Sequence, residues 1–322
     1  ESVAVLNTGD SGFGDADLFF GGDKAQWKRF GNSMMLRLAL RLIKVDPAAS
    51  KTWAEKAIAG GVMESNDDIA YVQHTIGPEG VNQNGHGEVF MVDASMRISE
   101  TFRTILEDDP RLPILAQRRK DESTDPADLL GLKNGLDGPM VMDEYGYENL
   151  DEFAEPNRNI ITGRDAPMIF QTYAEVEFML AEANIRWGSP GTSDPAVHYA
   201  NGVTAAMQML ELYGDAAVID PADIAAYLAA HPYDPSMGLE MIATQYWVAT
   251  FLNEYETFAN WRRIELPVLV PTNYPGNVTN GTIPRRLTYS TSEQSNNTEN
   301  YNAAIARQGP DELTTRVWWD VS

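Results

Sequence analysis

The first strong pattern along the chain is helical and lies between residues 24 and 45. An apolar stripe there repeats at steps of three and four residues, made by Trp27, Phe30, Met34, Leu38 and Leu42. Leu36, Leu40 and Ile43 cover a second face, which leaves a narrow basic stripe of Arg37, Arg41 and Lys44. A helix that is apolar nearly all round is a buried one. We therefore predict a buried helix whose basic stripe is neutralised by carboxylates or solvated.

Helices then follow in pairs. Asp46-Pro47 closes the first helix and opens a second one, which Gly60-Gly61 stops. Because the link is so short, the two helices must pack antiparallel. A second pair is predicted at Tyr173–Trp187 and from Pro195 to Tyr213. Such pairs are typical of tetratricopeptide-like repeats.

Two more helices are predicted after the second pair, a short one from Asp220 and a long one from about Pro235 to Phe258. Between and after the helices, residues 109–167 and 267–281 are dense in Gly, Pro, Asn and Asp and are predicted to be irregular. The predicted fold class is all-α, with tetratricopeptide-like hairpins and long irregular loops. No linker divides the chain, so we expect residues 1–322 to form a single domain.

Composition narrows the function classes. With 43% hydrophobic residues the chain is globular, and its formal charge of −23 disfavours nucleic acid because no basic run offsets it. The absence of cysteine excludes disulfides, thiolate catalysis and Cys-based metal sites. No apolar run approaches the ~20 residues that a membrane-spanning helix needs.

A search for catalytic patterns finds little. The four histidines lack metal-ligand spacing and are expected in loops or at the surface, and no nucleophile elbow, dinucleotide loop or phosphate loop is present. Glu175 and Glu182 share one helix face and could form the acidic pair of an all-α glycoside hydrolase. The alternative is that they are solvated or pair with arginines. We expect no enzyme activity and no cofactor.

A cation site is a weaker candidate near the start. Asp10, Asp15 and Asp17 lie in a Gly-rich segment and could ligate a hard cation such as calcium. The spacing does not match an EF-hand loop, so a turn with solvated acids is the favoured interpretation.

Aromatic residues in the irregular segments suggest a ligand surface. Tyr145 and Tyr147 lie in the stretch 143–149, which ends at Asn149, and Tyr274 lies in the later irregular segment. Tyrosine rings offer flat faces for sugar rings, while Asn and Arg side chains, here Asn149 and Arg158, can supply hydrogen bonds. The alternative is that these tyrosines pack the loops onto the helices.

The end of the chain is unusual for a terminus. It carries several arginines and the adjacent residues Trp318 and Trp319, and two such rings can each bury roughly 200 Å². We predict that this tail is pinned across the helical hairpins and serves structure rather than ligand binding.

Five ordered segments resemble the motifs of one protein family. They are the Trp27–Ala39 helix, the Asp109–Pro113 turn, the Tyr173–Ala183 helix, the Glu256–Pro267 segment, in which Phe258 replaces the family's first Trp, and the closing stretch from Pro284 to Asp320. Together they resemble the SusD/RagB family of surface lipoproteins, the nutrient-capturing partners of TonB-dependent outer-membrane transporters in Bacteroidota. The resemblance covers essentially the whole chain.

The resemblance implies a function and a location. It implies capture of an oligosaccharide at the outer surface of the outer membrane, without catalysis, for a SusC-like TonB-dependent transporter. The family begins with a lipidated cysteine and a first helical region, so we expect the N-terminal part of the family and its lipid anchor to be absent from this chain. The motif residues are then structural. Oligopeptide binding, and less so a helical-repeat scaffold for a protein partner, remain alternatives.

Overall fold

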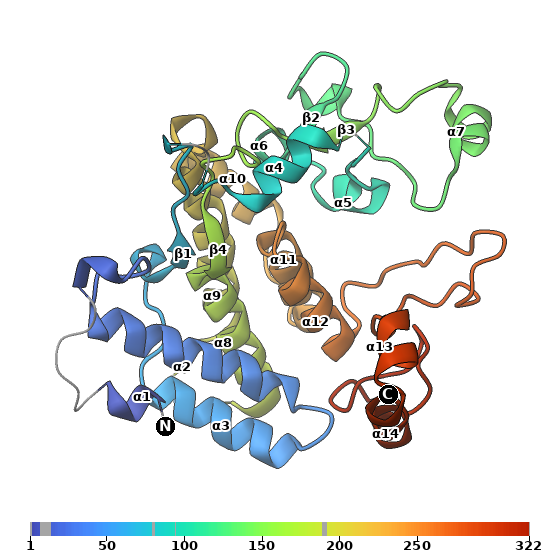
Figure 1. The fold of residues 1–322 in the computed structure, drawn as a ribbon. Coiled ribbons are helices and arrows are strands. Elements are labelled where there is room, and N and C mark those ends of the chain that lie inside the picture. Colours follow the sequence, from blue (N-terminus) through green and yellow to red (C-terminus); the bar gives the residue numbers. More distant parts are fainter. Residues whose placement is uncertain (1, 7–13, 79–80, 94, 189–191, 322) are drawn as a thin grey trace.

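The computed structural model describes residues 2–6, 14–78, 81–93, 95–188 and 192–321 (Figure 1). Helices dominate it, which confirms the predicted fold class. The helices are α1 (Ser2–Val5), α2 (Lys24–Arg41), α3 (Pro47–Ala59), α4 (Gly85–Val92), α5 (Glu100–Ile105), α6 (Leu112–Leu115), α7 (Gly138–Tyr145), α8 (Tyr173–Trp187), α9 (Pro195–Gln208), α10 (Pro221–Ala230), α11 (Gly238–Ala249), α12 (Glu254–Ile264), α13 (Thr291–Asn296) and α14 (Thr298–Gln308). None of the described helices is long and apolar enough to cross a membrane.

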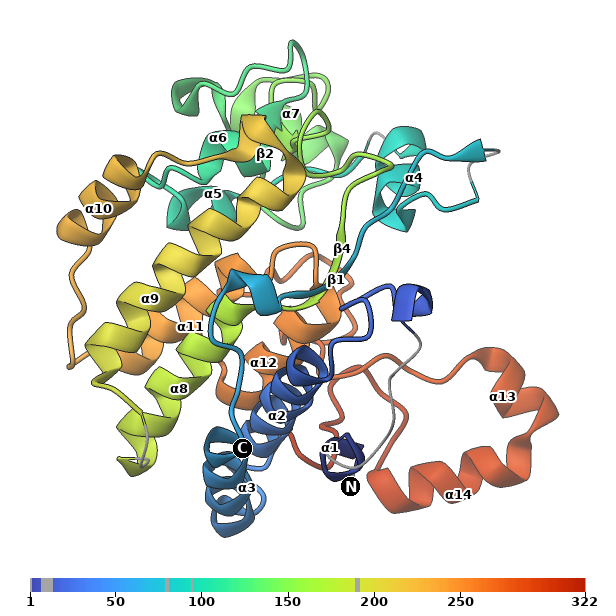
Figure 2. The ribbon, with the colours of Figure 1, turned by 90° about the vertical axis from the view of Figure 1, so that its left-hand side faces the viewer.

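Four short strands form two antiparallel pairs. Strand β1 (Ala70–Val72) pairs with β4 (Met168–Gln171), and β2 (Ala116–Arg118) pairs with β3 (Ala154–Pro156). The first pair lies beside the helical hairpins, and the second anchors the lobe that carries α5 and α7 (Figures 1 and 2).

The two predicted hairpins are present. Asp46 caps α3 through the backbone N–H of Ala49, and Gly60 ends that helix. Helix α8 begins with a capping box, in which Thr172 and Glu175 satisfy each other's backbone N–H groups. Helices α8 and α9 approach very closely, because a Cβ built on Gly202 would lie 2.5 Å from the ring of Phe178. The α9 segment tightens into a 3-10 turn at Met209–Tyr213.

The predicted long helix from Pro235 to Phe258 is wrong, since the structure has two helices there, α11 and α12. They are separated at residues 250–253, where Leu252 adopts φ +67°. The hydroxyl of Thr250 donates to the carbonyl of Tyr246, and the hydroxyl of Thr257 donates to the carbonyl of Thr250. Side chains that bond backbone carbonyls in this way compete with the helical ladder and favour a break.

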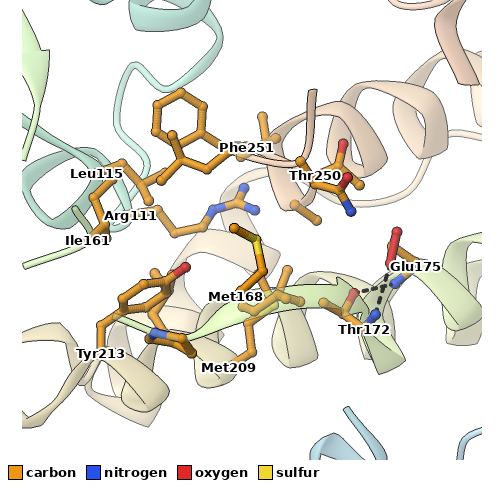
Figure 3. A pocket seen from close by; sticks show the side chains of 18 of the residues that line it. Arg111, Leu115, Ile161, Met168, Thr172, Glu175, Met209, Tyr213, Thr250 and Phe251 are labelled. Carbon is orange, nitrogen blue, oxygen red and sulfur yellow. Dashed lines mark hydrogen bonds between the residues drawn. The ribbon is translucent and has the colours of Figure 1, made fainter. Parts of the chain in front are cut away.

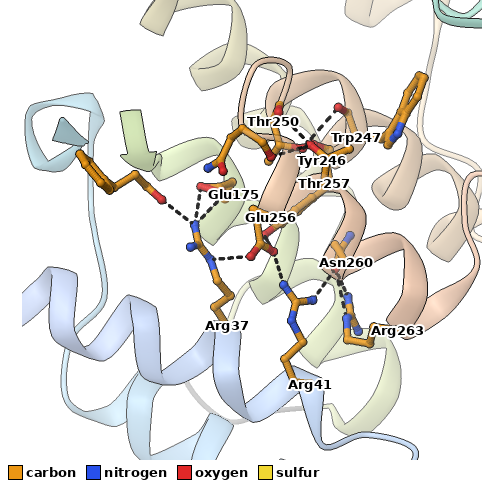
Figure 4. A network of polar contacts seen from close by, with 12 residues as sticks. Arg37, Arg41, Glu175, Tyr246, Trp247, Thr250, Glu256, Thr257, Asn260 and Arg263 are labelled. Carbon is orange, nitrogen blue, oxygen red and sulfur yellow. Dashed lines mark hydrogen bonds and ion pairs between the residues drawn. The ribbon is translucent and has the colours of Figure 1, made fainter. Parts of the chain in front are cut away.

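Helix α2 is held to the core by buried ion pairs (Figure 4). Arg37 donates to both carboxylate oxygens of Glu175 on α8, at 2.8 and 2.9 Å, and Arg41 pairs with Glu256 on α12. All four side chains are at least nine-tenths buried. The prediction that carboxylates neutralise the basic stripe is therefore confirmed for these two arginines, whereas Lys44 is exposed.

The closing tail is pinned by charge rather than by both tryptophans. Asp320 is fully buried and accepts hydrogen bonds from Arg285 and Arg316. Trp319 lies under Arg262, 4.8 Å from its guanidinium carbon, but Trp318 is 68% exposed. The tail thus contacts α12 and the end of α2, and the expected burial of Trp318 is wrong.

Candidate functional site

Both carboxylates of the acidic pair considered for glycoside hydrolysis form ion pairs with arginines. Glu182 accepts from Arg263 on α12 and from Arg186 on its own helix. Burial alone would raise the pKa of Glu182, but the two arginines outweigh it and lower the pKa to about 2. Burial raises the pKa of Glu175 despite its pairing with Arg37. Glu182 lines none of the described pockets, and Glu175 borders only a cavity of about 40 Å³, which is too small for a sugar ring.

One histidine is more deeply placed than the sequence suggested. His198 on α9 is buried, so the expectation of a loop or surface position is wrong for this residue. Its Nε2 accepts the backbone N–H of Ser193, which leaves Nδ1 to donate to Glu177 on α8 at 2.6 Å. Tyr173 donates to the other oxygen of Glu177. The cluster therefore ties α8 to α9.

The tyrosines predicted to bind ligand lie where two segments that are far apart in sequence come together. Residues 267–281, here called the arm, extend from α12 without forming a helix or strand (Figure 1). The hydroxyl of Tyr274 on the arm donates to Asp137 at 3.0 Å, and the hydroxyl of Thr272 donates to the carbonyl of Asn134. The arm is thus held against residues 133–137, immediately before α7.

Helix α7 carries Tyr145 at its far end, and Tyr147 follows the helix. Tyr145 is its last residue, so the prediction of a loop at that position is wrong, and Gly146 ends the helix in the left-handed conformation. The missed signal was Asp137 followed by Pro139, a helix N-cap with proline in the first turn. The hydroxyl of Tyr145 accepts the backbone N–H of Lys133.

The rings of Tyr145 and Tyr147 pack edge-on against Phe153, with centroids 4.9 and 5.9 Å away. Phe153 is fully buried, so both tyrosines help to fix the lobe. Tyr147 nevertheless stays 37% exposed and Tyr274 41% exposed. We call the surface formed by residues 133–137, α7, Tyr147 and the arm the tyrosine surface.

Asn149 and Arg158 are used by local structure. The side-chain oxygen of Asn149 accepts the backbone N–H of Asp151 in a short turn. Arg158 donates to Glu155 on β3 at 2.8 Å, and Arg119 also pairs with that buried carboxylate. Burial raises the pKa of Glu155 in spite of these cations. Asn149 remains exposed at the edge of the lobe, whereas Arg158 is committed to an ion pair.

The candidate cation ligands near the start behave as turn residues. Asp17 accepts the indole N–H of Trp27 and the backbone N–H groups of Phe19 and Gly22. Burial opposes the shift, but these hydrogen bonds lower the pKa of Asp17. Asp15 lies in a short 3-10 turn, and Asp10 lies outside the described residues. Within the described ranges no group of three or more His, Asp or Glu side chains is arranged to hold a metal ion.

Several cavities were not foreseen from the sequence, among them two that share residues of the α11–α12 corner. A small, partly open one of about 40 Å³ lies around Arg111 (Figure 3). Arg111 is buried and bonded to Asp109 and Gln245, and its Nη1 has no partner among the described residues. The space has room for ordered water but not for a sugar ring.

The other is an open groove of about 510 Å³ between α5 and the α11–α12 corner, at the base of the arm. Its walls are mostly aromatic and aliphatic, including Phe102, Trp247, Phe251 and Phe258. These residues come from segments that are far apart in sequence, so no local pattern could have revealed the groove.

Comparison with known proteins identifies the family. The family model described as starch-binding associating with outer membrane matches residues 1–290. The chain belongs to the SusD family. This confirms the resemblance found in the motifs.

Solved SusD homologues agree along the whole chain. A structure named as a chitin-binding protein is 32% identical with a TM-score of 0.86, and all of this chain covers 70% of it. A chitin-binding SusD homologue from Flavobacterium johnsoniae is 26% identical with a TM-score of 0.80 and the same coverages. A SusD homologue from Bacteroides uniformis, at 24% identity and a TM-score of 0.79, shows the fold alone. No curated protein matches.

Within this SusD family member, the motif residues have structural tasks. Arg37, Glu175 and Glu256 belong to the buried network, and the Asp109–Arg111 turn is closed by its own ion pair. The tyrosine surface lies outside these motifs, on segments without a transferable pattern.

Proposed function

We propose that this protein captures oligosaccharides at the outer face of an outer membrane and passes them to a SusC-like TonB-dependent transporter. The observation that carries the proposal is membership of the SusD family over residues 1–290, together with two similar solved structures that are named as chitin-binding. We further propose that residues 1–322 act as a single domain that binds its ligand without chemical change.

The tyrosine surface is the proposed contact with the glycan. It offers the exposed faces of Tyr147 and Tyr274, and it has polar groups close by in Asp137, Asn134 and Lys133. Sugar rings stack on aromatic faces through their C–H surfaces, while their hydroxyls need such polar partners. The ring of Tyr274 is held by its hydrogen bond to Asp137, and the ring of Tyr147 is held by its packing on Phe153.

A panel titration tests the proposed ligand class. Calorimetry should detect binding of oligomers of N-acetylglucosamine or of glucose, the units of chitin and starch. Mass spectrometry of the same mixtures after overnight incubation should show the oligomers unchanged. Binding of none of these oligomers would contradict the choice of ligand, and shortened oligomers would contradict the absence of catalysis.

A basic oligopeptide is the second candidate, favoured by the formal charge of −23. A lysine-rich peptide library included in the same titration distinguishes the two ligands. Tight peptide binding without glycan binding would replace the first proposal.

A further inference from the structure

The small pocket around Arg111 contains a charged donor without a partner. Arg111 lies in the Asp109–Pro113 turn and is only 1% exposed. Its Nε and Nη2 donate to the two carboxylate oxygens of Asp109, at 2.9 and 2.6 Å. Nη1 lies on the opposite edge of the planar guanidinium, is buried, and has no hydrogen-bond partner among the described residues. Because a buried charged donor is costly to leave unpaired, this atom indicates a place for a ligand.

A second donor reaches the same pocket from the helical hairpins. Tyr213, the last residue of the 3-10 turn that follows α9, lines the pocket together with Arg111. Figure 3 shows both side chains projecting into the pocket from different elements. Burial raises the pKa of the Tyr213 hydroxyl to about 12, so the group stays protonated at neutral pH and can donate. The pocket thus offers two donors from separate parts of the fold.

The buried side-chain acceptors of the pocket already accept hydrogen bonds. The side-chain oxygens of Asn84, Thr172 and Thr250 each accept one. Both oxygens of Glu175 accept from Arg37, and Figure 3 shows this carboxylate at one end of the pocket. The other walls are mainly apolar and include Leu115, Ile161, Met168, Met209 and Phe251. The pocket is therefore richer in free donors than in free acceptors.

We propose that this pocket binds a small monovalent anion of the size of chloride, held by Nη1 of Arg111 and the hydroxyl of Tyr213. An ordered water would need acceptors for its own two hydrogens, whereas an anion only accepts and so matches the two donors. The volume of about 40 Å³ suits an ion of this size, and the partly open mouth admits it from solvent. The formal charge of −23 opposes the approach of an anion, but salt at about 0.1 M screens this repulsion beyond about 10 Å.

The pocket lies at a junction of the fold. Its lining comes from α6, which runs directly into β2, from α9 and β4, and from the corner between α11 and α12. Unfolding separates these elements, so the anion binds the folded chain only and stabilises it by mass action. This stabilisation is independent of the proposed glycan contact.

Thermal melting in different salts tests the proposal. Sodium chloride and sodium bromide are compared with sodium gluconate at equal ionic strength, because gluconate is too large for the pocket. The melting temperature of the 322-residue chain should be at least about 2 °C higher in the two halides. Tyr213→Phe removes one donor with little change of shape and should abolish this difference. Tyr255→Phe, at a 90% exposed tyrosine on α12, is the matched control and should retain it.

Each protein is its own reference across the salts, so a lower overall stability of Tyr213→Phe does not obscure the result. Equal melting temperatures of the wild-type chain in the three salts would overturn the proposal. A halide effect that Tyr213→Phe retains would also overturn it, since a general salt effect does not depend on this hydroxyl. Crystals soaked in sodium bromide give a second readout, in which anomalous scattering should place bromide within hydrogen-bond distance of Nη1 of Arg111. An ordered water at that point in place of bromide would overturn the anion assignment.

Discussion

At the scale of single residues, buried charge does much of the work of holding distant segments together. Arg37 and Glu175 are 138 positions apart, and Arg41 and Glu256 are 215 positions apart. Their pairing could not be predicted from one sequence, because nothing local links such residues. The sequence predicted only that the basic stripe of α2 is either neutralised by carboxylates or solvated, since a buried cation is costly without a partner.

Removing the carboxylate of Asp320 should lower the free energy of unfolding far more than removing the exposed ring of Trp318. Asp320→Ala removes the buried carboxylate that pairs with the nearly buried Arg285 and leaves it only the half-exposed Glu265. Breaking a buried pair in this way costs about 3–5 kcal/mol. Trp318→Ala is the matched control in the same tail, and its 68% exposure predicts a change within about 0.5 kcal/mol. Urea denaturation measures both, and equal losses for the two variants would contradict this assignment.

The contribution of Glu182 to the stability of the folded protein should fall over a defined range of acidic pH. Its pKa is lowered in the folded protein from 4.5 to about 2. Its stabilisation is therefore complete above pH 4.5 and is lost as the pH falls from there towards 2, an effect of up to about 3 kcal/mol. The stability gap between wild type and Glu182→Gln should shrink over this range in urea titrations at pH 6, 4.5 and 3.5. Glu299→Gln, at an exposed position on α14, should show a constant small gap.

At the scale of elements, the helices with strong caps were predictable and the breaks were not. Helix ends are marked by residues that cap them locally. Asp46 and Thr172 are N-caps, and Gly188 ends α8 in the left-handed conformation. The interruption at Leu252 depends on hydroxyl-to-carbonyl bonds within a stretch whose apolar spacing continues unbroken. Helix α7 was missed because its N-cap was passed over in a stretch rich in Gly and Pro.

The close contact between α8 and α9 should be intolerant of one added methyl group. Gly202→Ala places a Cβ 2.5 Å from the ring of Phe178, between α8 and α9. Although alanine favours a helix by about 1 kcal/mol over glycine, overpacking costs about 1–3 kcal/mol. We expect net destabilisation by thermal melting. Gly138→Ala at the start of α7, with open space around it, should be neutral or stabilising. A stabilised Gly202→Ala variant would contradict the packing described here.

At the scale of the whole molecule, the fold was predictable because its motifs occur in order along the entire chain. The ligand site stays a prediction. Tyr147 and Tyr274 are exposed as expected, but their common surface depends on an arm that reaches back to residues 134 and 137. Contacts across so long a span follow from the tertiary fold and not from local pattern.

The most direct test of the account is the titration of N-acetylglucosamine hexamer into three proteins. The wild-type chain should bind it, and the double variant Tyr147→Ala/Tyr274→Ala should bind at least tenfold more weakly, a loss of about 1.4 kcal/mol. Tyr255→Ala removes a 90% exposed tyrosine from α12, outside the tyrosine surface, and should bind like the wild type. Undiminished binding by a fully folded double variant would contradict the proposed site, and no binding by the wild type would contradict chitin oligomers as its ligand.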